Sequence, residues 1–261
     1  MTVPIGLQLY SIREAMEKDF IGSLEKVKAA GYDCVEFAGY GGLDATDLRA
    51  ELDRIGLKGH SSHIGWQQLR DHLPDVVKDS RALGLQWVVC PGYPLKTVDD
   101  CRDLADLLTR TAVALEPYGI RVAYHNHSSE FAVVEGRFLL DWLMELTKPG
   151  QVYAELDLCW AQYADVDPVA YLTKLAERAG PVHCKDINEN YAGMKGEDIN
   201  VEVGQGMIDF RAIFDFVEKQ GQLDRGLIVE QEAFIRDPFE SIAMSSRHIR
   251  ATLREMGLND I

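Results

Sequence analysis

The chain has 261 residues, enough to bury the core of one large domain without disulfide bonds. Its 42 acidic residues outnumber its 27 basic residues, which gives a net charge of −15. This acidic excess argues against a nucleic-acid partner, because nucleic-acid binding depends on neutralising phosphates. It also argues against attachment to a membrane surface, and it suits a soluble acidic protein.

Cysteine usage and the first residues indicate a cellular compartment. The five cysteines are an odd number and form no CxxC pair, so we expect reduced thiols, as in the cytosol. The opening stretch, MTVPIGLQLYS, has no basic start and no long apolar run, so we expect no signal peptide. The sequence contains no run of about 18 apolar residues, so we expect no membrane-spanning helix. We therefore expect a cytoplasmic protein.

Short apolar runs rich in β-branched and aromatic residues predict eight strands. They lie at residues 5–11, 33–39, 57–63, 86–92, 120–127, 152–160, 181–187 and 226–234. Helical spacing predicts helices between them, at residues 20–31, 45–56, 98–119, 167–180, 209–221 and 238–257. Gly31 and Gly56 are typical helix ends, and Asp167 followed by Pro168 is a typical helix start.

The alternation of strands and helices predicts the fold class. Repeated βα units indicate a parallel sheet, and eight of them in about 260 residues indicate a closed (β/α)8 TIM barrel. We expect it to form a single domain over residues 1–261. The alternative is a doubly wound open sheet, but no GxGxxG or Walker-type loop follows the first strand.

Polar side chains close the last four predicted strands, in pairs spaced two residues apart. The pairs are His125 with His127, Glu155 with Asp157, His183 with Lys185, and Glu230 with Glu232. Residues two apart share one face of a strand, and the active site of such a barrel lies at these strand ends. Any single histidine is as often structural, but buried charges are costly unless paired or bound to a metal. Together the four pairs predict a metal site.

Five motifs carry a resemblance to a known family: YHNHSSEF, ELDLCW, HCKD, VGQGMIDF and IVEQE. The chain resembles the xylose isomerase-like barrels over nearly its whole length. That superfamily includes endonuclease IV, sugar and keto-sugar epimerases, inosose dehydratase and sugar phosphate isomerases. The resemblance implies one divalent metal ion, held by a Glu, an Asp, a His and a Glu after the fifth to eighth strands.

Three positions of this chain match those ligands directly: Asp157, His183 and Glu230. The first position departs from the pattern, because ungapped alignment places His125 where the family has Glu, and we therefore favour His125 as the fourth ligand. A shift of two would select His127 instead, and Glu155 could supply a carboxylate. Such a donor set suits Mn²⁺, Mg²⁺, Co²⁺ or Zn²⁺.

The endonuclease branch carries extra histidines for a multi-zinc cluster. Here Cys90 stands where that branch has the His of a His-Pro-Gly motif. His60 and His63 are present on the third predicted strand, but we expect no complete cluster. This departure and the acidic charge both argue against an abasic-site nuclease.

The resemblance implies chemistry through an enediolate, which a divalent ion stabilises by polarising a carbonyl and a neighbouring hydroxyl. Glu230 is the implied base, and the other candidate acid or base groups are Lys185, Glu155 and His127. The candidate contacts to a small-molecule sugar are Trp160, Glu232, His63 and Glu36. Gly204 and Gly206 are expected to supply positive φ in a loop before a helix.

Three functions follow from these expectations, in order of preference. The first is a metal-dependent isomerase or epimerase of a keto-sugar or polyol. The second is a metal-dependent lyase or dehydratase acting on a 3-keto sugar or an inosose. The third is a sugar-binding barrel without turnover. The sequence leaves open the substrate, the metal and whether the chain forms a homo-oligomer.

Overall fold

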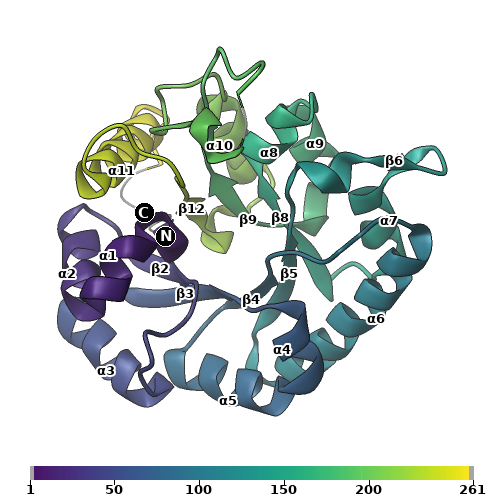
Figure 1. Cartoon of the computed structure of the whole chain (residues 1–261), viewed down its shortest axis with the longest axis horizontal. Coiled ribbons are helices and arrows are strands. Elements are labelled where there is room, and N and C mark those ends of the chain that lie inside the picture. The colour runs from purple at the N-terminus through teal and green to yellow at the C-terminus, as the bar shows by residue number, and fades with distance from the viewer. Residues whose placement is uncertain (1–2, 195, 259–261) are drawn as a thin grey trace.

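The computed structural model describes residues 3–194 and 196–258, which form a closed barrel of eight parallel strands (Figure 1). Around the barrel the strand order is β1-β12-β9-β8-β5-β4-β3-β2. The strands are β1 (Ile5–Gln8), β2 (Cys34–Phe37), β3 (Lys58–His63), β4 (Trp87–Cys90), β5 (Arg121–His125), β8 (Val152–Asp157), β9 (Ala179–Cys184) and β12 (Leu227–Val229). Each lies within or overlaps one predicted strand, so the TIM-barrel prediction is confirmed.

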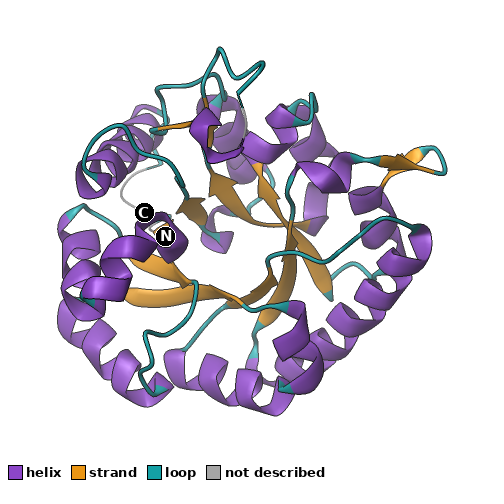
Figure 2. Ribbon diagram, in the orientation of Figure 1, coloured by secondary structure: helices purple, strands orange, loops and turns teal. Residues whose placement is uncertain are grey.

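Helices surround the barrel on its outside (Figure 2). They are α1 (Arg13–Lys18), α2 (Phe20–Ala29), α3 (Ala45–Ile55), α4 (Trp66–Asp71), α5 (Leu73–Leu83), α6 (Val98–Leu115), α7 (Leu139–Leu146), α8 (Leu158–Tyr163), α9 (Pro168–Leu175), α10 (Phe210–Lys219) and α11 (Pro238–Glu255). All six predicted helices are present, and α1, α4, α5, α7 and α8 are additional. None of the helices in the described residues is both long and apolar enough to cross a membrane.

The predicted end of α3 and the predicted start of α9 are confirmed, with the residues that the sequence indicated. Gly56 ends α3 with φ +80°, a left-handed conformation that glycine adopts without steric cost. Asp167 begins α9 by accepting hydrogen bonds from the N–H groups of Val169 and Ala170, and Pro168 occupies the first helical turn.

Short elements complete the chain. Two antiparallel pairs lie outside the barrel: β6 (Val133–Val134) with β7 (Arg137–Phe138), and β10 (Asp186–Ile187) with β11 (Asn200–Val201). The 3-10 helices are η1 (Leu9–Ile12), η2 (Glu116–Tyr118), η3 (Ser128–Phe131), η4 (Ala176–Arg178), η5 (Gly196–Ile199) and η6 (Leu223–Arg225). The β6–β7 hairpin projects from the rim of the barrel in Figure 1.

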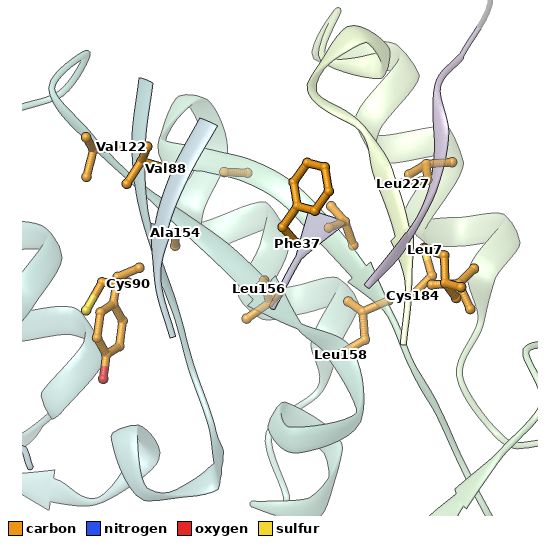
Figure 3. Packing of buried hydrophobic residues seen from close by; sticks show 14 of the residues in the cluster. Leu7, Phe37, Val88, Cys90, Val122, Ala154, Leu156, Leu158, Cys184 and Leu227 are labelled. Atoms are coloured by element: carbon orange, nitrogen blue, oxygen red, sulfur yellow. The ribbon is translucent and has the colours of Figure 1, made fainter. Parts of the chain in front are cut away.

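Alternation along the strands divides the buried side chains between two cores. One set packs between the barrel and its helices and includes Leu7, Val122 and Leu156 (Figure 3). Burying each such side chain contributes roughly 1.5–3 kcal/mol relative to exposure. A separate cluster of Trp87, Val89 and Ala123, flanked by Tyr153 and Arg121, fills the start of β4, β5 and β8. Along each of these strands the polar residues follow the apolar ones in the sequence, so the polar side chains lie together at the C-terminal ends of the strands.

The Asp186 carboxylate fastens the loop between β11 and α10. It accepts hydrogen bonds from the backbone N–H groups of Ile187 (2.9 Å), Gly204 (2.9 Å), Gly206 (2.9 Å) and Ile208 (3.1 Å). Gly204 has the predicted positive φ, +86°, but Gly206 does not. Gly206 is needed for space instead, because a Cβ there would lie 2.2 Å from the carbonyl oxygen of Ile187.

Candidate active site

Strand register brings the predicted site residues together at the barrel mouth. His125 on β5 lies opposite Glu155 on β8, and Asp157 on β8 lies opposite His183 on β9. The segment after β12 adds Glu230, which lies 3.3 Å from His183, measured from Oε2 to Nδ1. Residues separated by more than 100 positions in the chain therefore share one small volume.

The first cluster comprises His125, Asp157, His183 and Glu230, the four residues predicted as metal ligands. Each can offer a ligand atom, and these atoms all lie within 4.8 Å of one another. Nδ1 of His183 lies 3.9 Å from Oδ2 of Asp157. All four residues are buried.

Two atoms of the first cluster show that it fits a cation. Oδ2 of Asp157 and Nδ1 of His125 are buried and have no hydrogen-bond partner, a costly arrangement that a metal ligand would relieve. Burial lowers the pKa of His125 to about 3, so its ring is neutral and free to coordinate. Burial, aided by the negative charge of Glu230, raises the pKa of Asp157 to about 7. Two imidazoles and two carboxylates are a donor set that Zn²⁺, Mn²⁺ and Co²⁺ accept.

The second cluster comprises Glu36, His63, Glu155 and His183, whose ring it shares with the first. His63 donates from Nε2 to Oε2 of Glu155 (2.9 Å), and His183 donates from Nε2 to Oε1 of Glu36 (2.7 Å). Gln8 also donates to Oε1 of Glu36, at 2.7 Å. Although burial lowers the pKa of His63, the carboxylates of Glu36 and Glu155 outweigh it and raise that pKa to about 10.

A buried ammonium borders the first cluster. Nζ of Lys185 donates to Oε2 of Glu230 (3.2 Å) and to Glu232, and it lies 5.0 Å from the centroid of the Trp160 ring. Burial lowers the pKa of this ammonium, but the charges of Glu230 and Asp157 outweigh burial and raise it. Lys185 therefore stays charged and holds Glu230 in place.

A cavity of about 380 Å³ opens onto these clusters, a volume suited to a small ligand. Its lining residues are Tyr10, Ala38, His63, Pro91, His125, His127, Glu230 and Glu232. Both cavity carboxylates, Glu230 and Glu232, come from the segment after β12. The imidazoles come from the ends of β3 and β5, elsewhere around the barrel.

The structure separates the predicted catalytic and substrate residues into two groups. His63, His127, Glu230 and Glu232 line the cavity, and Trp160 lies beside it, 5.8 Å from the His127 ring. Glu36 and Glu155 are fully buried behind the histidine rings. The remaining predicted residue is Lys185, described above. His60, noted in the sequence only as a histidine of the third predicted strand, donates to the carbonyl oxygen of Arg225.

Asn126 is a supporting residue that the sequence reasoning missed. Oδ1 of Asn126 accepts a hydrogen bond from the backbone N–H of Asp157, at 3.1 Å. The signal was present in the motif, because strand alternation directs the middle residue of His-Asn-His away from the face that His125 and His127 share.

Comparison with known proteins identifies the family. Residues 24–252 match the sequence model for the xylose isomerase-like TIM barrel. The chain belongs to that family. It is 28% identical to an inosose dehydratase from Geobacillus kaustophilus (strain HTA426), over 87% of this chain and 85% of that protein. It is 27% identical to an inosose dehydratase from Clostridium beijerinckii (strain ATCC 51743 / NCIMB 8052), over 62% of this chain and 58% of that protein.

A solved structure supports the same fold. A sugar phosphate isomerase/epimerase from Parabacteroides distasonis ATCC 8503 superposes with a TM-score of 0.82, covering 95% of this chain and 94% of its own. The two sequences are 24% identical, so this likeness bears on the fold alone. The named relatives are enzymes, and they include both dehydratases and isomerase/epimerases.

Proposed function

We propose that this protein is a divalent-metal-dependent lyase that removes water from an inosose or a related keto-sugar. The observation that carries the proposal is the placement of both cavity carboxylates on the β12 segment, with imidazoles at the ends of β3 and β5. The relatives named inosose dehydratase support the same reaction class. We expect a small-molecule substrate and no nucleic-acid partner.

The proposed chemistry begins at the carbon next to the substrate carbonyl. An ion held by the first cluster would supply Lewis acidity to the carbonyl and its neighbouring hydroxyl, which acidifies the adjoining C–H group. Glu230 takes that proton and returns it to the departing β-hydroxyl on the same face. The C–H and C–O bonds break, a C=C bond forms, and the proton and hydroxide leave together as water. Lys185 holds the Glu230 carboxylate in position.

Three imidazoles, those of His63, His125 and His127, line the cavity, and their protonation argues for chemistry on one face of the substrate. Epimerisation with inversion needs a proton removed from one face and another delivered to the opposite face. Burial lowers the pKa of both His125 and His127, so neither neutral ring is a ready proton donor at pH 7. Glu155, the other candidate base, has no surface in the cavity. For these reasons we place the lyase ahead of the isomerase or epimerase that the sequence alone favoured.

The reaction class can be tested directly. The purified protein, supplied with Zn²⁺ or Mn²⁺, is incubated with an inosose and with a set of keto-sugars, and the products are examined by mass spectrometry and NMR. We expect a product that has lost one water and gained a C=C bond. A product of unchanged mass with one inverted carbon would replace the lyase by an epimerase.

The role of Glu230 can be tested in D₂O. Glu230→Gln should slow both α-hydrogen exchange and product formation by roughly 10²- to 10⁴-fold, the usual contribution of a positioned base. Glu232→Gln is a matched change in the same segment after β12. It should leave the exchange rate within about ten-fold of wild type and act mainly on KM. Metal content is measured in both variants. Exchange at the wild-type rate in Glu230→Gln would exclude Glu230 as the base.

A further inference from the structure

We propose that a cleft between α4 and α6, outside the barrel mouth, binds a polyhydroxylated ring such as a cyclitol or a pyranose. The two helices are neighbours in Figure 1. The cleft has a volume of about 670 Å³, within the range of small-molecule pockets. Its chemistry comes from Trp66, Arg70, Tyr93, Asp103, Asp106 and Arg110. None of these six side chains lines the mouth cavity, so the proposal does not depend on the proposed function.

Two aromatic rings form the apolar wall of the cleft. The half-buried rings of Trp66, at the start of α4, and Tyr93, after β4, meet edge to face with 5.2 Å between their centroids. The Arg70 guanidinium lies 4.9 Å from the centroid of the Trp66 ring, and two hydrogen bonds of 2.8 Å join it to Asp71. These contacts hold the rings in place before a ligand arrives, which lowers the entropy cost of binding. The C–H face of a sugar ring can pack against such an apolar wall.

Helix α6 supplies the polar wall of the cleft. Asp103, Asp106 and Arg110 are three and four residues apart, so they lie on one face of the helix. Within the described residues, neither carboxylate accepts a hydrogen bond or forms an ion pair. The Arg110 guanidinium donates one hydrogen bond, from Nε to the carbonyl oxygen of Asp106 at 3.4 Å. The polar wall therefore has unused acceptors and donors for a ligand.

The charges of the cleft favour an uncharged ligand. Two carboxylates and two guanidiniums line it, so neither an anion nor a cation is preferred on charge alone. A hydroxyl group donates to a carboxylate and accepts from a guanidinium, so a polyhydroxylated ring uses both kinds of group. Hydrogen bonds to charged groups are roughly twice as strong as those between neutral groups. An apolar ligand would make the contacts of the aromatic wall but none of these hydrogen bonds.

The cleft adjoins the mouth along two segments of the chain. Trp66 follows His63 by three positions, and Tyr93 follows Pro91 by two. His63 and Pro91 line the mouth cavity, whereas Trp66 and Tyr93 line the cleft. Each segment therefore contributes one side chain to the mouth and another to the cleft, which places a bound ring at the rim of the barrel.

The indole N–H signals of the chain test the proposal by NMR, because its four tryptophans lie in different places. Trp66 lines the cleft, and Trp160 lies beside the mouth cavity. Trp87 is in the barrel core, and Trp142 donates to the carbonyl oxygen of Val134. Isotopically labelled protein is titrated with myo-inositol and with methyl β-glucopyranoside. We expect the Trp66 signal, assigned by its loss in Trp66→Phe, to shift and saturate, while the signals of Trp87 and Trp142 stay in place.

Substitutions on both walls locate the bound ring. Tyr93→Ala and Asp106→Asn should each weaken binding at the Trp66 signal by about ten-fold, the usual loss for one well-placed contact to an aromatic or charged group. Tyr118→Ala is the matched control, because the Arg81 guanidinium lies 4.2 Å from the Tyr118 ring in a similar pair outside the cleft. It should bind like the wild type. Circular dichroism checks the fold of each variant.

Two outcomes would overturn the proposal: no saturable shift of the Trp66 signal with either ligand, or a shift that Tyr93→Ala and Asp106→Asn leave unchanged. A shift of the Trp160 signal alone would place the sugar only in the mouth, which refutes this inference and leaves the proposed function intact. A saturable Trp66 shift in a protein that converts neither an inosose nor a keto-sugar would support this inference while the proposed function fails.

Discussion

Two asparagine amides hold the backbone at the barrel mouth. Asn126 accepts a hydrogen bond from the N–H of Asp157, and Asn200 accepts one from the N–H of Glu232, each at 3.1 Å. Both amides are buried, where a hydrogen bond is stronger than in water. They fix the segments that carry a candidate ligand and a cavity carboxylate. The His-Asn-His motif therefore combines two rings for the site with one amide that joins β5 to β8.

We expect the buried ring of His60 to make the stability of the fold depend on pH. Its ring is buried and donates to the carbonyl oxygen of Arg225 at 2.8 Å. Burial lowers the pKa of His60, although the negative charges of Glu36 and Glu155 act in the opposite direction. The folded protein therefore keeps the ring neutral at pH values where the unfolded chain takes up a proton, near pH 6.5. The stability from a neutral His60 is present above that pH and is lost as the pH falls below it.

We expect this residue to contribute a slope of up to about 1.4 kcal/mol per pH unit to the free energy of unfolding below roughly pH 6.5. Urea unfolding between pH 7.5 and 5.5 measures the slope. In His60→Gln the amide can still donate to Arg225 but cannot titrate, so its slope should be smaller by about one proton. Equal slopes in the two proteins would contradict the assignment.

The sequence predicted which residues would meet but not all of their partners. The strand-end pairs predicted that polar residues would meet at the mouth, and the family resemblance selected His125, Asp157, His183 and Glu230 among them as ligands. The second cluster depends on side-chain rotamers and on contacts across the barrel, such as His63 with Glu155. Periodicity along one strand contains no information about either.

At the scale of elements, the junction between β8 and α8 shows why one predicted strand was too long. The apolar run 152–160 continues past the strand, but Asp157 caps α8 by accepting a hydrogen bond from the N–H of Trp160 at 2.8 Å. The cap uses Oδ1 and leaves Oδ2 for the first cluster. A short buried helix and a short buried strand have similar composition, so the boundary could not be read from the run alone.

The loop held by Asp186 provides a test at this scale. In Gly206→Ala the new Cβ would meet the Ile187 carbonyl oxygen at 2.2 Å and the Asp186 carboxylate at 2.3 Å, so the loop must shift. We expect a loss of about 1–3 kcal/mol in the free energy of unfolding, the usual cost of overpacking. Gly92→Ala is the matched control, because nothing lies within 4 Å of a Cβ there and its φ is not positive. Equal stability of the two variants would show that the loop does not need the close approach.

At the scale of the whole molecule, barrel closure is what assembles the site. The eight βα repeats predicted closure, and the order β1-β12-β9-β8-β5-β4-β3-β2 places the first and last strands side by side. Closure brings Glu36 on β2 within reach of His183 on β9, although 147 positions separate them in the chain. The mouth thereby concentrates negative charge, since the two clusters include the buried carboxylates of Glu36, Glu155, Asp157 and Glu230. The folded chain should therefore be most stable when cations occupy its mouth.

Thermal unfolding with and without divalent ions measures this coupling. An ion that binds only the folded chain stabilises it by about 2.7 kcal/mol when its free concentration is 100 times its Kd. For a chain of this size each kcal/mol raises Tm by about 2–4 °C, so we expect Zn²⁺ to raise Tm by about 5–10 °C per bound ion relative to chelator-treated protein. His183 belongs to both clusters, so His183→Ala should lose most of this rise, whatever its own starting Tm, whereas His60→Gln should keep it. An equal rise in His183→Ala and the wild type would place the stabilising ions outside the barrel mouth.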